Sequence, residues 1–244
     1  MKKNNISLAL VTGAAHRLGR VFARTLAKQG YAILLHYNSS VDAAESTAKE
    51  LRSLGAEVIL AQADLADADS ALGLFSVVDS SPHPLRVLVN SAATMQPADA
   101  RTLTLPDWDA TMNLNLRTPF FLAQQAQIRM RDAGGGLIVN ITDVGAEKVW
   151  SKFPDYVVSK AALQSLTKVL ARSFAPSVRV NAIAPGLVLP AHNFPAEEWE
   201  RLIERIPLKR PADMSEIASA LEFLLKNKYI TGQTITVDGG YSLL

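Results

Sequence analysis

The chain has 244 residues, of which 48% are hydrophobic, and it contains no cysteine. Such a chain can bury one large core, but it can form neither disulfides nor thiolate metal sites. The formal net charge is +2, with Lys and Arg spread along the sequence, and the four His show no metal-ligand spacing. We therefore expect a single cytoplasmic domain over residues 1–244, with no nucleic-acid partner, no membrane segment and no metal.

An apolar run at residues 6–12 leads directly into a glycine turn, TGAAHRLG, at residues 12–19. The run is too short for a signal peptide and predicts a strand buried on both faces of a parallel sheet. A helix follows, with Gly30 as its stop. This arrangement binds a diphosphate at the helix N-terminus, although an ordinary strand-to-helix turn has the same elements. Arg17 stands where a third glycine is expected, and its guanidinium can either reach a phosphate or polar ring or face solvent.

Residues 31–37 predict a second strand, which ends in the sequence HYNSS rather than in an Asp or Glu. An acidic residue at this point accepts hydrogen bonds from the ribose of NAD and repels the 2′-phosphate of NADP. Its absence favours NADPH, with residues 36–40 as phosphate donors and His16 or Arg17 as a source of positive charge. A polar loop without a ligand is the alternative.

Helices and strands alternate through the rest of the chain, which predicts an α/β fold: a Rossmann-type, doubly wound, seven-stranded parallel sheet with helices on both faces. Helices are expected at residues 41–54, 106–131, 154–175 and 212–226, and strands at residues 56–65, 85–90, 137–142, 178–186 and 233–240. Pro119 should bend or break the helix in which it lies. Residues 187–210 resemble a loop with one short helix, and we interpret them as a lid over the substrate.

Three further positions lie where a cofactor is expected. Asp64 ends a strand and can hydrogen-bond adenine or cap the next helix. The small residues 91–93 let a nicotinamide ribose approach the backbone, but small residues also form ordinary turns. Asn115 interrupts the apolar pattern of its helix, and such a residue usually has a local structural role.

Tyr156 and Lys160 are four residues apart, so they share one face of a helix. A free tyrosine loses its proton near about pH 10, and a neighbouring ammonium group lowers that pKa. Asp143 lies thirteen residues before Tyr156, at the carboxyl end of a strand, where open α/β sheets bind ligands. The three side chains are candidates for proton transfer, although the Tyr and Lys spacing alone is common by chance.

The motifs TGAAHRLG, NSAA and IAPG and the Tyr156 and Lys160 pair occur in the order and spacing of the short-chain dehydrogenase/reductase family, which the chain resembles over nearly its whole length. The resemblance implies that Tyr156 is the general acid/base, that Lys160 binds the nicotinamide ribose and lowers the pKa of Tyr156, and that Asn115 holds a water in a proton relay. It also implies a homotetramer that packs helices 106–131 and 154–175 and the C-terminal segment across two-fold axes. The family usually has a Ser at the position of Asp143.

Arg17, the HYNSS strand end and Asp143 together resemble one branch of that family, the pteridine reductases and dihydromonapterin reductases. In this branch the Arg contacts cofactor phosphate and pterin, the Asp and Tyr manage protons at the ring, and NADPH delivers the hydride. Reduction of a C=N bond needs a proton at the ring nitrogen, and a carboxyl group can supply it while pairing with the aminopyrimidine edge. These enzymes stack the pterin on an aromatic side chain, for which Met95 is the candidate here, or Trp150 or Phe153 in its place.

We therefore predict an NADPH-dependent reductase of a pteridine, with Arg17, Met95, Asp143 and Tyr156 at the substrate. The alternatives are a carbonyl reductase or alcohol dehydrogenase that acts on a ketone, with Asp143 only hydrogen-bonding the substrate, and a catalytically silent NADPH-binding protein. The predicted cofactor contacts are, in chain order, Gly13, His16, Arg17, Leu18, Gly19, His36, Tyr37, Asn38, Ser39, Ser40, Asp64, Leu65, Asn90, Ser91, Ala92, Tyr156, Lys160, Pro185, Gly186 and Leu187.

Overall fold

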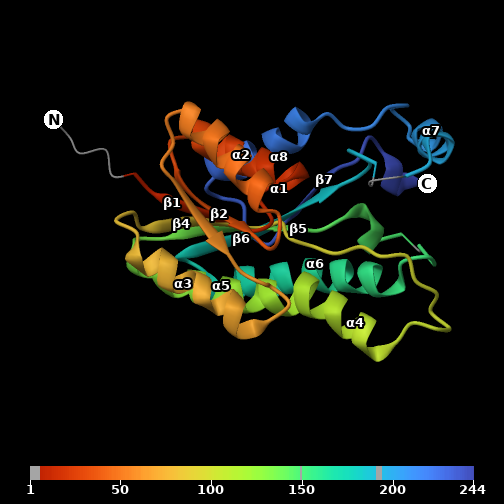
Figure 1. Ribbon diagram of the computed structural model, residues 1–244. Helices are drawn as coiled ribbons and strands as arrows, with labels where there is room; N and C mark the ends of the chain where they lie inside the picture. Colours follow the sequence, from red (N-terminus) through yellow and green to blue (C-terminus); the bar gives the residue numbers. More distant parts are fainter. Residues whose placement is uncertain (1–5, 149, 191–193) are drawn as a thin grey trace.

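The computed structural model describes residues 6–148, 150–190 and 194–244 (Figure 1). In this part of the chain, seven strands form one parallel sheet in the order β3-β2-β1-β4-β5-β6-β7. The strands are β1 (Leu8–Val11), β2 (Ala32–Tyr37), β3 (Val58–Gln62), β4 (Leu85–Asn90), β5 (Gly136–Ile141), β6 (Val178–Pro185) and β7 (Thr234–Val237). The strand order reverses between β1 and β4, and open sheets bind ligands at the carboxyl ends of the strands at such a point.

Helices cover both faces of the sheet, as Figure 1 shows. The α-helices are α1 (Arg17–Lys28), α2 (Val41–Ser53), α3 (Ala68–Ser80), α4 (Leu105–Met112), α5 (Thr118–Asp132), α6 (Pro154–Phe174), α7 (Ala196–Arg205) and α8 (Met214–Lys226). Buried side chains of α1, α2 and α8 form a core on one face, and those of α3, α5 and α6 form a second core on the other. The predicted fold class is therefore confirmed.

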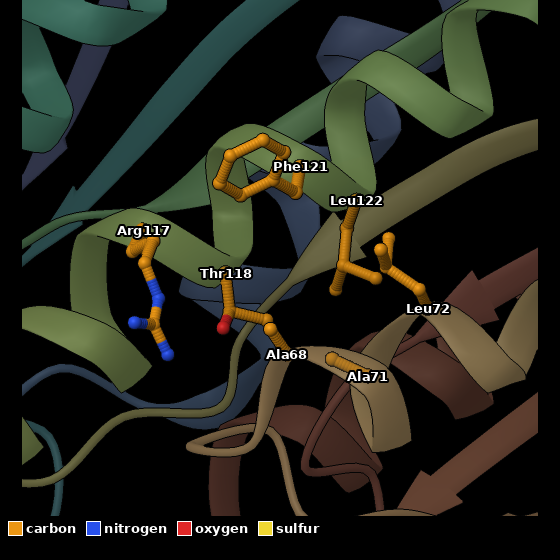
Figure 2. Close-up of a pocket in the computed structure, with 7 residues that line it drawn as sticks. All are labelled: Ala68, Ala71, Leu72, Arg117, Thr118, Phe121 and Leu122. Atoms are coloured by element: carbon orange, nitrogen blue, oxygen red, sulfur yellow. The ribbon is translucent and has the colours of Figure 1, made fainter.

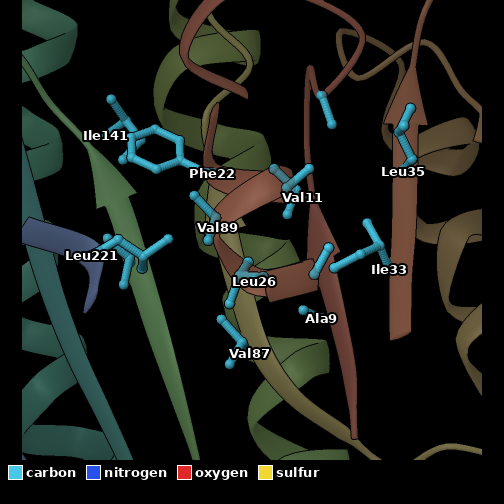
Figure 3. Packing of buried hydrophobic residues seen from close by; sticks show 14 of the residues in the cluster. Ala9, Val11, Phe22, Leu26, Ile33, Leu35, Val87, Val89, Ile141 and Leu221 are labelled. Carbon is cyan, nitrogen blue, oxygen red and sulfur yellow. The ribbon is translucent and has the colours of Figure 1, made fainter. Parts of the chain in front are cut away.

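Alternating side chains of the central strands supply both cores. Ala9 and Val11 of β1 point toward Phe22 and Leu26 of α1, whereas Leu8 and Leu10 belong to the opposite core. Figure 3 shows the first of these clusters, in which the labelled side chains are fully or almost fully buried. Burial on both faces explains why the strands are continuous apolar runs in the sequence rather than alternating ones.

The helix expected at residues 106–131 is divided. It consists of α4, a π-helical turn at Asn113–Arg117 and α5, and Pro119 lies in the first turn of α5. A proline has no N–H to donate, and the backbone is helical on both sides of Pro119, so the helix accommodates the missing hydrogen bond at the wider turn. The interruption is confirmed, and it takes the form of a wider turn just before the proline.

A small apolar hollow lies between α3 and α5 (Figure 2). Its walls are Ala68, Ala71, Leu72, Arg117, Thr118, Phe121 and Leu122. None of these is a predicted site residue, and two of the polar ones are used locally: Thr118 donates to the Leu65 carbonyl at 2.6 Å and Arg117 to the Ala66 carbonyl at 3.0 Å. The hollow is therefore a packing feature of the second core's edge.

The described residues of the predicted lid contain one helix, α7, close to the expected position. Residues 191–193 of the lid lie outside the described residues. Within the ranges described, no helix combines the length and the apolar character needed to cross a bilayer.

Candidate active site

The glycine turn between β1 and α1 needs glycine at two places. Gly13 has φ +63°, and a side chain there would meet Cα of Ala92 at 3.0 Å, while one at Gly19 would collide with the Gly13 carbonyl. Arg17 also has positive φ, at +47°, although it is not a glycine. This conformation costs an ordinary residue about 1 kcal/mol, and it explains why a glycine is expected at position 17. The main chain of the turn is thus closely packed, and at both glycines main-chain groups rather than side chains line its surface.

Three buried side chains hold this turn in place. The Thr12 hydroxyl accepts from the N–H groups of Ser91 and Ala92 at 2.9 and 3.1 Å, which joins the end of β1 to the segment after β4. Thr47 of α2 donates to the Ala15 carbonyl at 3.1 Å. Thr12 belongs to the TGAAHRLG motif, but its hydrogen bonds and those of Thr47 could not be predicted, because hydroxyl residues in turns and on helices carry no distinctive pattern.

His36 is the third of these side chains, and its predicted phosphate contact is wrong. The residue is 1% exposed. Nδ1 accepts from the Gly13 N–H at 3.0 Å, and Nε2 lies 3.1 Å from the Ala63 carbonyl. Burial lowers the pKa of the imidazole below its usual value, so His36 is neutral and turned inward rather than charged and available to a ligand.

The loop after β2 carries the other groups expected at a 2′-phosphate. Asn38 and Ser39 are exposed, and Tyr37 and Ser40 are half-buried. Gln62, at the end of β3, donates to the Asn38 carbonyl at 2.8 Å and so fixes the start of the loop. His16 and Arg17 are also exposed, and Leu18 is half-buried. The structure thus leaves polar, uncharged groups where an NAD-type carboxylate would stand.

Asp64 does not cap the next helix. Asp67 is the N-cap of α3 and accepts from the Ser70 N–H, whereas Asp64 accepts from the Ala66 N–H at 2.9 Å and remains exposed. Of the two roles considered for Asp64, helix capping is therefore excluded. Leu65 is buried and offers only its backbone.

Asn90 lies mainly within the protein interior. Its amide donates to Oδ1 of Asn140 at 2.8 Å, and Asn140 in turn donates to Thr167 of α6 at 2.9 Å. The Asn90 Oδ1 atom is buried and has no hydrogen-bond partner among the described residues. The Asn90 side chain is therefore internal, while Ser91 and Ala92 are half-buried beside the turn.

Asp143, Tyr156 and Lys160 meet at the carboxyl end of β5. The Tyr156 hydroxyl donates to Asp143 Oδ2 at 2.8 Å, and the Gly145 N–H donates to Oδ1 at 2.6 Å. Lys160 donates to the Ile141 carbonyl at 2.8 Å, and its ammonium lies 5.7 Å from the centre of the Tyr156 ring. The structure thus brings together the three residues that sequence spacing linked.

The pKa values of Tyr156 and Asp143 favour retention of their protons, whereas that of Lys160 favours loss. Burial raises the pKa of Tyr156 well above its usual value, and the negative charge of Asp143 raises it further. The net shift of the Tyr156 pKa is therefore upward in this arrangement, and Lys160 is not among its causes. Burial also raises the pKa of Asp143, and it lowers that of Lys160 to about 8. Together, these shifts favour a protonated phenol and make protonation of the adjacent carboxyl easier.

The loop after Asp143 is tightly packed. A side chain at Gly145 would lie 2.6 Å from the Trp150 ring and 3.0 Å from Asp143 Oδ1. Trp150 also packs near Tyr241, with ring centroids 6.5 Å apart, and joins Val144 and Ile206 in a small third core. This packing holds the Gly145 amide against the Asp143 carboxyl.

Asn115 lies within the π-helical turn and is 1% exposed. Its side chain accepts from the Thr94 N–H and donates to the Thr94 carbonyl, both at 2.9 Å, and also donates to Ser159 at 3.1 Å. Ser159 in turn donates to the Tyr156 carbonyl at 2.7 Å. The side chain of Asn115 thus ties the turn to the Tyr156 helix, and Ser159 is a contact that the sequence did not reveal.

The expected substrate side is formed by three segments. Met95 is 41% exposed and lies between Thr94 and Ala98, whose N–H donates to the Lys152 carbonyl at 2.8 Å. Arg17 donates to the carbonyls of Leu189 and Pro190 at 2.9 Å each.

The segment after β6 forms the remaining side. Pro185 is buried, Leu187 is half-buried, and Gly186 passes so close to Asp238 that a side chain would lie 2.7 Å from its Cα. The lid therefore begins at a point where β6 and the chain after β7 are in close contact.

A glycine turn at a sheet's switch point, beside a buried Tyr and Lys at the carboxyl edge, defines a dinucleotide-dependent oxidoreductase. The family model described as enoyl-(acyl carrier protein) reductase matches residues 13–242. The chain belongs to the short-chain dehydrogenase/reductase family, as the sequence predicted.

Similar proteins differ in their stated substrates. A 3-oxoacyl-(acyl-carrier-protein) reductase from Staphylococcus epidermidis is 34% identical over 237 residues, which are 95% of this chain and 97% of the relative. The FolM alternative dihydrofolate reductase 1 from Brucella canis, solved with NADP, is 35% identical with a TM-score of 0.92, covering 98% of this chain and 95% of that one. An acetoin dehydrogenase from Enterobacter cloacae is 30% identical, with a TM-score of 0.90 and coverage of 99% and 97%.

Proposed function

We propose that the protein is an NADPH-dependent reductase of a pteridine, of the dihydropterin or dihydromonapterin type. The observation that carries this proposal is the hydrogen bond of 2.8 Å between the Tyr156 hydroxyl and the Asp143 carboxyl. A pteridine offers ring nitrogens that must be protonated on reduction and an aminopyrimidine edge that pairs with a carboxyl. The resemblance in fold to an alternative dihydrofolate reductase supports the same substrate class.

The residues around the glycine turn fit a dinucleotide. Gly13 admits no side chain because it packs against Ala92, and the turn leads into the start of α1, where the free N–H groups of a helix N-terminus can bind a diphosphate. The loop at residues 37–40 has no carboxylate to repel a 2′-phosphate, and this favours NADPH over NADH. When bound, NADPH supplies the hydride for the reduction.

Tyr156 and Asp143 supply the proton. The high pKa of Tyr156 keeps its hydroxyl protonated, and the phenol can release the proton to a substrate that develops negative charge. Asp143 accepts that hydrogen bond before the substrate arrives, and its raised pKa also lets it carry a proton for the ring nitrogen. Lys160, held by the Ile141 carbonyl, supplies positive charge beneath the phenol.

Asn115 contributes through its main chain in this scheme. Its side chain is engaged by Thr94 and Ser159, so its carbonyl is the group that we assign to the relay water. The wider π-helical turn changes the partners of the local backbone carbonyls, which suits this role. Proton supply to Tyr156 would then run through Lys160 and the water that this carbonyl holds.

A ketone is the second candidate substrate, since the chain is also similar to a 3-oxoacyl reductase and to an acetoin dehydrogenase. A ketone needs one proton at its oxygen, which Tyr156 can deliver alone, and Asp143 would then only hydrogen-bond the substrate. The two candidates thus differ in how strongly they depend on Asp143.

The deciding experiment measures NADPH oxidation by the purified protein with dihydrobiopterin, dihydromonapterin, dihydrofolate and a panel of ketones. We expect turnover of a pterin, a clear preference for NADPH over NADH, and loss of pterin turnover by about 100-fold in Asp143→Ser. The serine variant should gain activity toward ketones, because it restores the usual residue. Good ketone reduction with no pterin turnover would reject the pteridine proposal, and equal use of NADH would reject the assignment of residues 37–40.

The assembly that we propose is a homotetramer. Exposed apolar side chains lie on the helices expected at its interfaces: Leu105 on α4, Phe121 and Ile128 on α5, and Val158 and Val169 on α6. Burial of such side chains against a second copy of the chain stabilises the assembly. Sedimentation equilibrium should give about four times the 26.4 kDa chain mass, and a monomer would contradict the proposal.

A further inference from the structure

His36 joins the ends of three neighbouring strands at the cofactor side of the sheet. Its Nδ1 accepts from the Gly13 N–H at 3.0 Å, and its carbonyl accepts from the Ala14 N–H at 2.9 Å. Its Nε2 lies 3.1 Å from the carbonyl of Ala63, just beyond β3. One residue of β2 therefore binds both the glycine turn and the end of the next strand.

The two ring contacts define one form of the imidazole. A backbone N–H can only donate, so Nδ1 must be unprotonated, and a carbonyl can only accept, so Nε2 must carry the hydrogen. The neutral ring with its hydrogen on Nε2 satisfies both contacts. Burial favours this neutral form, and the nearby charge of Asp64 opposes it only in part.

The contact matters because the glycine turn has little freedom to move. Gly13 has φ +63° and lies against Ala92, so its backbone is confined on one side. On the other side, His36 accepts hydrogen bonds from the N–H groups of Gly13 and Ala14. These two groups are therefore not ligands for an anion. Loss of the acceptor would leave the partly buried Gly13 N–H without its present partner, and that cost would be relieved by a shift of the turn.

We infer that His36 is a positioning residue of the dinucleotide site, which sets the conformation of the glycine turn from inside the protein and touches no part of the cofactor. Its role therefore concerns the diphosphate, which NADPH and NADH share, and not the 2′-phosphate, which only NADPH has. The inference rests on the dinucleotide site of the proposed function but not on the pteridine substrate.

Two variants separate the contacts of the ring. In His36→Asn the amide oxygen takes the place of Nδ1, so the acceptor for Gly13 is kept. In His36→Gln the amide reaches the place of Nε2, so the Ala63 contact is kept and the Gly13 acceptor is lost. Dissociation constants for NADPH and NADH are measured on the full chain from nicotinamide fluorescence, without any substrate. His83→Asn is the matched control, because His83 is paired with Glu57 at 2.8 Å away from the turn.

We expect His36→Gln to weaken NADPH and NADH by the same factor, about tenfold, while His36→Asn and the control bind both nearly as the wild type does. Loss of NADPH affinity alone would overturn the inference and support a direct phosphate contact. Equal weakening in both His36 variants, or in neither, would also overturn it. If His36→Gln does not fold, tight binding of both dinucleotides by His36→Asn supports the inference, and a tenfold loss in that variant rejects it.

Discussion

At the glycine turn, buried side chains hold the main chain in place, whereas at the proton site the main chain holds the side chains. Thr12, His36 and Thr47 bind backbone groups around the turn. By contrast, the Gly145 N–H donates to Asp143, and the Ile141 carbonyl accepts from Lys160. The first arrangement presents backbone groups to a ligand, and the second presents titratable groups. Substitutions at the turn should therefore alter binding, and substitutions at the proton site should alter the reaction.

Tyr156→Phe should have the largest effect. The variant lacks the hydroxyl that donates to Asp143, and we expect the rate of reduction to fall by about 1,000-fold. Binding of NADPH, measured by fluorescence titration, should change little, because the ring and its packing remain. An unchanged rate of NADPH oxidation would remove Tyr156 from its role as proton donor.

The pH dependence of the rate provides a second test of the proton site. Burial lowers the pKa of Lys160 to about 8, and the charge of Asp143 partly opposes this shift. The ammonium therefore loses its charge as the pH rises through about 8, and we expect the reduction rate to fall above that pH. In Asp143→Asn the opposing charge is gone, so the fall should begin at a lower pH. Initial rates between pH 6 and about 10 test this prediction, and an unshifted profile in the variant would contradict it.

The relation between Tyr156 and Lys160 shows what could be predicted from the sequence. The spacing of four residues placed both side chains on one helix face, and the strand before Asp143 placed the carboxyl at the same edge of the sheet. The direction of the Tyr156 pKa could not be predicted, because it depends on burial and on the distance to Asp143 rather than on spacing. Pro119 likewise predicted an interruption, but not a π-helical turn containing Asn115.

Thr47→Val should have a smaller effect, confined to binding. The variant keeps the shape of the buried side chain and removes the hydrogen bond of 3.1 Å to the Ala15 carbonyl. We expect the dissociation constant for NADPH to rise about fivefold, with little change in the maximal rate of the saturated enzyme. Thr47→Ser retains the hydroxyl and is the matched control. A fall in maximal rate with unchanged binding would contradict the division between the two regions.

The smallest expected effect is that of the backbone conformation at Arg17 on the stability of the protein. Arg17→Gly and Arg17→Ala both remove the contacts with Leu189 and Pro190, but only glycine adopts φ +47° without strain. The glycine variant should therefore be more stable than the alanine variant by about 1 kcal/mol in urea unfolding. Equal stability would mean that the turn relaxes in one of the variants.

His36 shows why part of the cofactor site could not be predicted. It occurs in a strand buried on both faces, so the apolar pattern carries no alternation that tells whether a polar side chain points inward or outward. Its position next to the exposed loop suggested a ligand, and only the paired contacts with Gly13 and Ala63 show that it is internal. Asp64 and Asp67 present the same difficulty, because either carboxylate suits the start of α3.

The packing around Gly145 limits how this site can be redesigned. No side chain fits there without moving Trp150 or Asp143, so substitutions at position 145 should disturb the proton site itself. Variation of substrate range should instead be sought at Met95, which is 41% exposed and borders the site without holding it together. The rigid and the variable parts of the site therefore lie on different segments of the chain.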